Sequence, residues 1–530
     1  MAMRCGIDLG TTYSAISWYD PHNNRVETVD LAMIADGMNI VRSVVYYPEG
    51  GASPVVGETA WNAAKQHPER VFIAIKRSMG TDYTRTIDGT TYTPQQVSSE
   101  ILKALVTEAQ AFFGEEVKDV VISVPAYFGD LERAATEEAG QLAGLNVLGI
   151  LSEPSAAGLA FAAARMADII GHYFMVFDLG GGTLDVTLIH VTSASDENGV
   201  QKLKPETLCK QGDRELGGLD WDHALAELVA EKALQQHGMD VTADPTNKAI
   251  LLENCEKAKR RLGQLNIVSC IPDLVPAHEV DVTLAEFEDR TRDLVERARL
   301  RLERALEEAE NLDHVPEGAP PGEKGVKRDM IEVLLAGGGT KMPMIRKMIE
   351  EVMGRPSLQH GNPELLVSMG AAYWAHLLQP DSTISVYQPT PEGDVATRVG
   401  LQESSGEISC YAVGVKALES DGQGGWQEYN SEVVPNAAPF NQIYDKEFQT
   451  SEDGMTEIPI ELYKGESRDL AQCESLLRFT ITGLPPGRPK GQRVKVTLGY
   501  DTNGILSGNA VDVATGKTVD IVWDRSKTSS

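Results

Sequence analysis

The feature that most constrains this 530-residue chain is a pattern that occurs twice. An apolar run ends in an aspartate, a turn rich in glycine and threonine follows, and a second apolar run continues. The pattern reads GIDLGTTYSAISWYD at residues 6–20 and FMVFDLGGGTLDVTLIHV at residues 174–191, with a third related stretch, EVLLAGGGTKMP, at residues 332–343. A repeat with this spacing is too long for a solenoid. It predicts a duplicated α/β domain whose two halves each begin with a strand, a turn and a strand.

The residues of these turns suit phosphate and magnesium chemistry, although a plain hairpin needs only two turn residues. An aspartate at a strand end can hold hydrated Mg²⁺, and backbone N–H groups and hydroxyls of a glycine turn can hold phosphate oxygens. The first turn offers Asp8, Gly10, Thr11 and Thr12, and the second offers Asp178, Gly180, Gly181, Gly182, Thr183 and Asp185. Two such turns facing each other would hold a triphosphate from both sides, without a Walker A loop. Ordinary hairpins with a capping aspartate are the alternative, and the repeated order disfavours it.

Composition excludes several classes of protein. The net charge of -30 argues against a nucleic-acid binder, which must neutralise phosphates with lysine and arginine. Six scattered cysteines without a Cys-x-x-Cys pair predict neither a disulfide framework nor a zinc site. Charged residues interrupt the most hydrophobic region, so it does not span a membrane. We expect a soluble, reduced, cytoplasmic protein with no membrane partner.

The order of predicted elements divides the chain. Residues 93–117 predict a helix that starts at Pro94, residues 117–128 a buried strand that ends at Pro125, and residues 291–312 a long charged helix. After residue 380 the composition changes. Residues 381–394 predict a linker, and residues 395–530 an all-β domain with hairpin turns at residues 503–504 and 515–516.

With these motifs the sequence resembles the DnaK-type (seventy-kilodalton heat-shock) chaperone family. The matching stretches occur in the family's order and cover nearly all of residues 1–380: GIDLGTTYS, AIKRSMG, VPAYFGDLERAAT, LSEPSAAGLA, VFDLGGGTLDV, GDRELGGLDWD, ENCEKAKRRLG, LLAGGGTKMP and NPELLVSMGAA. Later segments such as IPIELYKGES and LLRFTITGLPPG resemble the family's peptide-binding β-sandwich. The resemblance implies an α/β actin-like (ribonuclease-H-like, duplicated) ATPase domain of two lobes at 1–380, a linker at 381–394, and a β-sandwich at 395–530 without a helical lid.

The resemblance also implies catalytic roles. Asp8 and Asp178 would hold the waters around Mg²⁺, with Glu153 as a further carboxylate behind them. Lys76 would neutralise charge developing on the γ-phosphate and orient the attacking water, which suits a flexible point charge. The residues around the phosphates and the water would be Thr11, Thr12, Tyr13, Gly180, Gly181, Gly182, Thr183 and Asp185. The alternative interpretation of the same residues is that Lys76 is a surface lysine and that Glu153 simply caps the helix begun by Pro154.

The adenosine would be held by residues from two regions. Glu256, Lys259 and Arg260 share one face of a predicted helix, where they would otherwise be an ordinary charged face. The other nucleotide contacts implied are Gly217, Gly218, Gly263, Gly337, Gly338, Gly339, Lys341 and Glu364. Gly263 and Gly339 stand where the family has serines, and Lys341 where it has an arginine that stacks on the base. We therefore expect looser adenosine contacts, with ATP binding retained.

Three further departures concern partners. The family's linker carries leucines between aspartates, whereas residues 380–391 read PDSTISVYQPTP, which weakens the expected coupling of ATP to peptide binding. Gly149 stands where the family has an arginine that engages its J-domain co-chaperone, and Ser152 replaces a neighbouring asparagine. We expect weak or altered stimulation by J-proteins. Without a lid, a bound peptide should dissociate quickly.

The leading hypothesis is an ATP-hydrolysing, DnaK-like chaperone that binds unfolded or extended polypeptide in its β domain. Its ligands would be ATP or ADP with Mg²⁺, K⁺ is a candidate further cation, and a nucleotide-exchange factor is a candidate partner. The alternative keeps the ATPase but serves one dedicated protein partner, and two departures favour it: the linker, and the early strands of the β domain at residues 397–430, which match the family least where its peptide cleft lies. A sugar or acetate kinase is disfavoured, and an actin-like filament protein is an alternative on fold alone, which does not decide function.

Overall fold

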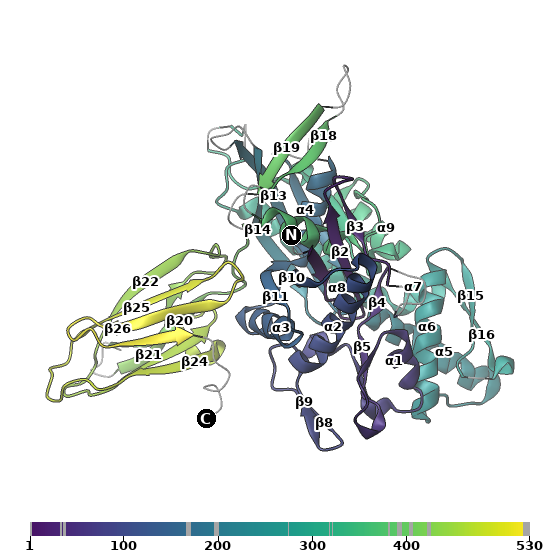
Figure 1. The fold of residues 1–530 in the computed structure, drawn as a ribbon, viewed down its shortest axis with the longest axis horizontal. Coiled ribbons are helices and arrows are strands. Elements are labelled where there is room, and N and C mark those ends of the chain that lie inside the picture. Colours follow the sequence, from purple (N-terminus) through teal and green to yellow (C-terminus); the bar gives the residue numbers. More distant parts are fainter. Residues whose placement is uncertain are drawn as a thin grey trace. The chain divides into compact units, whose positions relative to one another are not determined.

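The computed structural model describes residues 3–31, 34, 39–165, 171–195, 201–273, 275–316, 319–320, 322–379, 382–388, 395–401, 406–420 and 426–522 (Figure 1). The chain divides into two compact units. One comprises Met1–Tyr127 and Ala135–Glu403, and the other comprises Phe128–Ala134 and Ser404–Ser530. The first unit is mixed α/β and most of the second is all-β, as the sequence predicts.

The first unit contains two sheets with the same internal arrangement. One has the order β11-β10-β1-β2-β3 with β4 beside β2, and we call its surroundings the first lobe. The other has the order β17-β12-β13-β14-β19-β18 and defines the second lobe. Strand β1 pairs antiparallel with β2 and parallel with β10, and β12 likewise pairs antiparallel with β13 and parallel with β17. The duplication predicted from the repeated turns is confirmed in this topology.

The strands of the two main sheets have the following bounds: β1 Met3–Asp8, β2 Tyr13–Asp20, β3 Arg25–Thr28, β4 Val41–Arg42, β10 Val117–Val124, β11 Asn146–Ser152, β12 Tyr173–Leu179, β13 Leu184–Ser195, β14 Gln201–Asp213, β17 Ile331–Ala336, β18 Ile384–Gln388 and β19 Val395–Leu401. Smaller sheets join β5 Val44–Tyr46 to β6 Val55–Val56 and β7 Val71–Ile73, β8 Arg85–Ile87 to β9 Thr90–Tyr92, and β15 Ile267–Cys270 to β16 Val280–Thr283.

The helices begin and end where local chemistry permits. They are α1 Glu58–Ala63, α2 Pro94–Phe113, α3 Asp130–Leu142, α4 Glu153–Arg165, α5 Gly218–His237, α6 Pro245–Leu262, α7 Leu284–Arg290, α8 Arg292–Asn311, α9 Pro343–Met353 and α10 Leu366–Leu377. Helix α2 starts at Pro94 as predicted, because Thr93 and Gln96 form a capping box around its first turn. The predicted strand before Pro125 is β10, and the predicted charged helix is α8.

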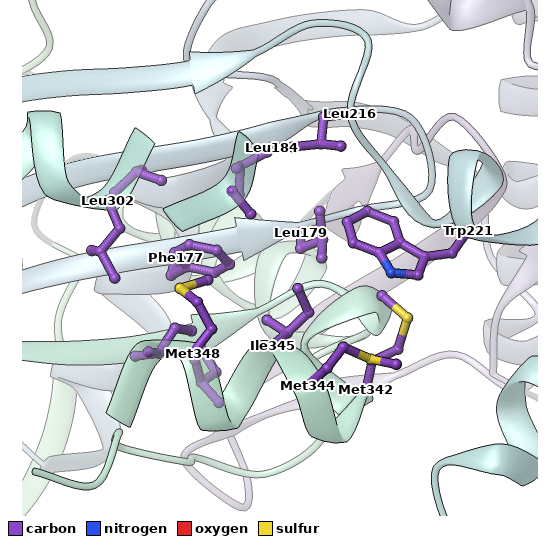
Figure 2. Close-up of a cluster of buried hydrophobic side chains, with 14 of the residues drawn as sticks. Phe177, Leu179, Leu184, Leu216, Trp221, Leu302, Met342, Met344, Ile345 and Met348 are labelled. Atoms are coloured by element: carbon purple, nitrogen blue, oxygen red, sulfur yellow. The ribbon is translucent and has the colours of Figure 1, made fainter. Parts of the chain in front are cut away.

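Large apolar cores hold the first unit together. The core of the second lobe packs α5, α6, α8 and α9 against β12 and β13, with Phe177, Leu179 and Trp221 fully buried (Figure 2). Another core contains residues of both main sheets, such as Tyr19 and Val176, together with residues of α4 and α10. The α4 and α10 helices therefore join the two lobes.

The crossing of α4 and α10 depends on a missing side chain. A Cβ atom added at Gly370 of α10 would lie 1.7 Å from the carbonyl oxygen of Ala156 in α4, a distance that no real Cβ contact allows. The sequences of both helices are rich in alanine and glycine, so their backbones can approach this closely.

The region predicted as a linker is partly built into the second lobe. Strand β18 pairs with β19, and β19 adds in parallel to β14. Ile384 and Val399 face each other in this hairpin and are buried in the core that the lobes share. The first unit therefore extends to residue 403 rather than 380, because these apolar side chains extend an existing sheet. Residues 381 and 389–394 of the predicted linker lie outside the described residues.

The second unit is a pair of sheets around one core. The sheets have the orders β21-β20-β23-β24 and β22-β25-β26-β27. Their strands are β20 Val413–Ser420, β21 Trp426–Val434, β22 Ile443–Gln449, β23 Ile458–Lys464, β24 Glu474–Ile481, β25 Arg493–Tyr500, β26 Leu506–Asp512 and β27 Thr518–Val522. Gly504 and Gly516 take positive φ values of 75° and 69° in the hairpins after β25 and β26, where the sequence predicts turns. In the described part of the chain, no helix is both long and apolar enough to cross a membrane.

The close helix crossing predicts a specific stability effect. Gly370→Ala should destabilise the first unit by about 1–3 kcal/mol, because the new methyl group meets backbone that cannot rotate away. Gly158→Ala on α4 is the matched control, since its Cβ would meet only the flexible Cδ1 of Ile189 at 3.1 Å. Thermal unfolding measures both variants. Equal melting temperatures for the two would contradict the role given to the crossing.

Candidate functional site

The two repeated turns touch each other across the cleft between the lobes. A Cβ atom added at Gly181 would lie 1.9 Å from Oγ1 of Thr12, and one added at Gly182 would lie 2.6 Å from Cγ2 of Thr11. The second turn therefore requires glycines because the threonines of the first turn occupy the space. Its backbone is closed by a hydrogen bond from the Gly180 N–H to the Thr183 carbonyl, at 3.1 Å.

Most of the predicted site residues line one cavity of about 330 Å³ in this cleft. They are Asp8, Gly10, Thr11, Thr12, Tyr13, Lys76, Glu153, Asp178, Gly180, Gly181, Gly182, Thr183, Gly218, Glu256, Lys259, Arg260, Gly263, Gly337, Gly338, Gly339, Lys341 and Glu364. Asp185 and Gly217 are not part of the lining. Asp185 is buried on β13 behind the second turn, and Gly217 donates its N–H to Asp220 at the start of α5.

Buried carboxyl groups concentrate at one end of this cavity. Asp8 ends β1 and Asp178 lies near the end of β12, while Glu153 begins α4. Burial raises the pKa of Asp8 to about 7, and the negative charge of Glu153 adds to this effect while Lys76 and the Ser123 hydroxyl oppose it. Burial and Glu153 likewise raise the pKa of Asp185 to about 7, and that of Asp178 well above its usual range. For all three carboxyl groups the raised pKa has the same cause, which is burial away from water together with the negative charge of neighbouring carboxylates.

Lys76 brings a positive charge to this group. It comes from a short 3-10 helix, Ile75–Ser78, and its Nζ lies 2.5 Å from Oε1 of Glu153. Both side chains are almost completely buried, so Lys76 is not a surface lysine and Glu153 does more than begin a helix. The next residue, Arg77, donates to the Gly182 carbonyl at 2.9 Å and contacts Asp220 at 3.1 Å, which connects the first lobe to the second turn.

The donor set fits a hydrated divalent cation beside phosphate. Oδ2 of Asp178 and Oγ1 of Thr12 are buried without a hydrogen-bond partner among the described residues. Oxygen ligands of this kind suit Mg²⁺, which keeps several of its waters when it binds. The described residues contain no group of three or more His, Cys, Asp or Glu side chains placed to hold a metal ion. Binding through water therefore stays a prediction for Asp8, Glu153 and Asp178.

Helix α6 brings its predicted charged residues to the other end of the cavity. Lys259 contacts Asp222 and the Gly218 carbonyl, both at 2.8 Å, and so holds the start of α5. Glu256 accepts a hydrogen bond from the Tyr13 hydroxyl at 2.6 Å and lies 3.2 Å from Arg260. The spacing that predicted one helix face is thus confirmed, and Glu256 links that face to the first turn.

Arg42 is a central residue that sequence reasoning missed. It lies on β4, where Nη1 contacts Glu256 and Nε contacts Glu58, both at 2.7 Å. Its guanidinium carbon lies 5.1 Å from the Tyr13 ring centroid and 4.5 Å from that of Trp61. Burial disfavours the Glu256 carboxylate, but Arg42, the Tyr13 hydroxyl and Arg260 outweigh it and lower the pKa of Glu256.

A second ion pair lies beside the first. Lys65, just after α1, contacts Glu253 at 2.6 Å, and Glu253 is one turn before Glu256 on α6. We call Arg42–Glu256 and Lys65–Glu253 the cross-cleft pairs, because each joins the first lobe to the second. The segment around Arg42 contains no motif, so only its position in the fold could reveal it.

The third glycine turn closes the cavity beside Lys341. Lys341 contacts Glu364 at 2.5 Å. A Cβ atom at Gly339 would lie 2.6 Å from Cγ of Leu179, so a larger residue does not fit there. At Gly263 the nearest atom would be 3.6 Å away, so a serine would fit. The two glycine departures from the family pattern thus differ in cause: Gly339 is required by its neighbours, and Gly263 leaves space.

The fold and the site together describe a two-lobed α/β unit whose cleft has residues suited to phosphate, followed in the chain by a β-sandwich unit. The sequence model described as Hsp70 protein matches residues 4–391 and 423–530. Similar curated proteins include the chaperone protein DnaK of Thermotoga neapolitana and that of Thermotoga petrophila, both 35% identical over 527 residues. The alignments cover 98% of this chain and 79% of each relative, and the DnaK of Thermosipho africanus is 34% identical over 525 residues. The chain belongs to the Hsp70 family, as its motifs predicted.

The cross-cleft pairs predict how fast a nucleotide leaves. Arg42→Ala should speed release of a fluorescent ADP analogue by at least about tenfold, because it breaks a nearly buried charge pair that spans the cleft. Stopped-flow displacement by excess ADP measures the rate. Arg25→Ala is the control, since Arg25 forms an exposed ion pair with Glu27 in the same lobe. Unchanged release from the Arg42 variant would contradict a closing role for this residue.

Proposed function

We propose that this protein is an ATP-binding and ATP-hydrolysing chaperone that binds extended polypeptide through its β unit under nucleotide control. Members of the Hsp70 family are ATPases, which supports the first half. The observation that carries the proposal is the pair of glycine–threonine turns in contact across one cavity, with buried carboxylates and Lys76 at one end.

In this proposal each end of the cavity has a separate task. Backbone N–H groups of the two turns and the Thr11 and Thr12 hydroxyls bind the phosphates. Glu256 and Arg260 position the adenosine, while Arg42 keeps Glu256 in place. Mg²⁺, held through water by Asp8, Glu153 and Asp178, supplies positive charge beside the phosphate oxygens when bound.

Lys76 has the catalytic task. Its ammonium is held by Glu153 at 2.5 Å, so it enters the cavity at a defined place. There it stabilises negative charge that develops on the γ-phosphate and orients the attacking water. Thr183 and Asp185 are proposed to assist near this water.

The β unit offers an edge for polypeptide. Strand β20 pairs with β21 along its whole length, whereas its pairing with β23 joins only Val413–Val415 to Leu462–Lys464. Ile458–Glu461 of β23 pair with β24 alone among the described residues. An extended peptide could add backbone hydrogen bonds at such an edge.

The catalytic assignment predicts a separation of binding from turnover. Lys76→Ala should lower the ATPase rate by at least about a hundredfold while ATP still binds, because one preorganised charge is lost from the transition state. Phosphate release and calorimetric ATP binding measure the two properties. Lys103→Ala, at an exposed lysine of α2, is the control. Turnover that survives in the Lys76 variant would refute this role.

Polypeptide binding predicts broad recognition. We expect several members of a panel of unrelated, fluorescently labelled peptides to bind. If the nucleotide controls the β unit, these peptides should bind more weakly in ATP than in ADP. Fluorescence anisotropy measures binding in each nucleotide. If no peptide binds and a single protein is instead recovered, the chain serves one dedicated partner and the general-chaperone proposal fails.

A further inference from the structure

Two thiols meet inside the second lobe, away from the cavity lining. Cys255 lies on α6, and Cys270 is the last residue of β15. Their Sγ atoms are 4.0 Å apart, and the side chains are 0% and 2% exposed. The distance is close to van der Waals contact, whereas a disulfide requires about 2 Å. A small movement or rotation would bring the sulfur atoms within bonding distance.

The hydrogen bond between these thiols makes them unequal. The contact with Cys270 raises the pKa of Cys255, and burial raises it further. The same hydrogen bond lowers the pKa of Cys270, against the opposing effect of burial. Because the thiolate is the reactive form, Cys270 is the thiol that reacts first.

The strand that carries Cys270 packs its inner side chains in the core of the second lobe but has few backbone partners. Strand β15 has four residues and pairs with β16 alone among the described residues. Isolated pairs of short strands are marginally stable. Side chains on its other face are open to solvent, with Ile267 56% exposed. Local opening of this hairpin would therefore give a small oxidant access to Cys270 without unfolding the lobe.

We propose that Cys255 and Cys270 form a reversible disulfide when the protein meets a hydroperoxide, and that this disulfide speeds release of the bound nucleotide. The Cys270 thiolate attacks one oxygen of hydrogen peroxide, the O–O bond breaks, and a sulfenic acid and water result after protonation. The Cys255 sulfur then attacks the sulfenic sulfur and expels a second water. Two thiols lose two electrons, the peroxide gains them, and a dithiol reductant reverses the step.

The second half of this inference rests on the proposed nucleotide site. Cys255 is the immediate neighbour of Glu256, which faces Arg42 across the cleft at 2.7 Å. Cys255 faces β15 in the core of the second lobe instead. The proposed disulfide ties α6 to β15, and the shift of the helix that accompanies it moves Glu256 relative to Arg42. The cross-cleft pair weakens as a result.

The experiment treats the whole protein with hydrogen peroxide, then maps disulfides by mass spectrometry and measures release of a fluorescent ADP analogue. We expect a cross-link between the peptides that contain Cys255 and Cys270, release that is about fivefold faster, and reversal of both by dithiothreitol. Cys255→Ser and Cys270→Ser should abolish both effects. Cys209→Ser is the matched control, because Cys209 is equally buried in the same core.

Each failure has a distinct meaning. The disulfide would be overturned if the wild-type protein showed no cross-link, or if Cys270 were oxidised to a sulfinic acid instead. This test does not depend on the folding of any variant. A cross-link with unchanged release would overturn the coupling to the cleft. If the reduced protein does not bind the ADP analogue at all, the proposed nucleotide site fails and the coupling with it, while the disulfide map still decides the first half.

Discussion

The structure depends on a group of carboxylates buried beside Lys76. Asp8, Asp178 and Glu153 come from three separate elements, and burial makes each of their charges costly unless a cation is near. Lys76 pairs with Glu153, and its charge also lowers the pKa of Asp8 and Asp178, yet burial and the neighbouring negative charges leave both pKa values raised. The cleft is therefore built for additional positive charge and for the phosphates that accompany it. The two glycine turns, the order of strands around them and the short helix carrying Lys76 all serve this arrangement.

Two kinds of contact hold the lobes around this charge, and they differ in strength. At the base, α4 and α10 cross so closely that Gly370 has no room for a methyl group, and apolar residues of both sheets share one core. At the mouth, Arg42 and Lys65 contact acids of α6 through ion pairs. Close packing resists small displacements, whereas Lys65 is partly exposed and its ion pair with Glu253 can be exchanged for water at lower cost. Such a pair of contacts favours opening at the mouth over sliding at the base.

The repeated turns were predictable from the sequence because their function needs particular residues at adjacent positions. Each turn holds its residues close together in the sequence: the first contains Asp8, Thr11 and Thr12, and the second contains the glycines at 180–182. Residues this close in the sequence stay close in the folded chain. The α6 residues were predictable for a similar reason, since helical spacing brings Glu256, Lys259 and Arg260 to one face. The edge hairpin of β18 and β19 was not, because proline and serine near Ile384 favour a linker and only the free edge of β14 gives its apolar residues a partner.

By itself, the sequence determined the duplicated strand–turn–strand units, the acids and glycines at their ends, the all-β character of most of the second unit and the family. These features are local, so short-range order along the chain is sufficient to specify them. Only the tertiary structure decided that Arg42 meets Glu256, that Cys255 meets Cys270 and that Gly181 must leave room for Thr12. Each of these contacts joins different elements, two of them across the cleft between the lobes. Packing of the whole unit brings such residues together, and their spacing along the sequence does not show that they are in contact.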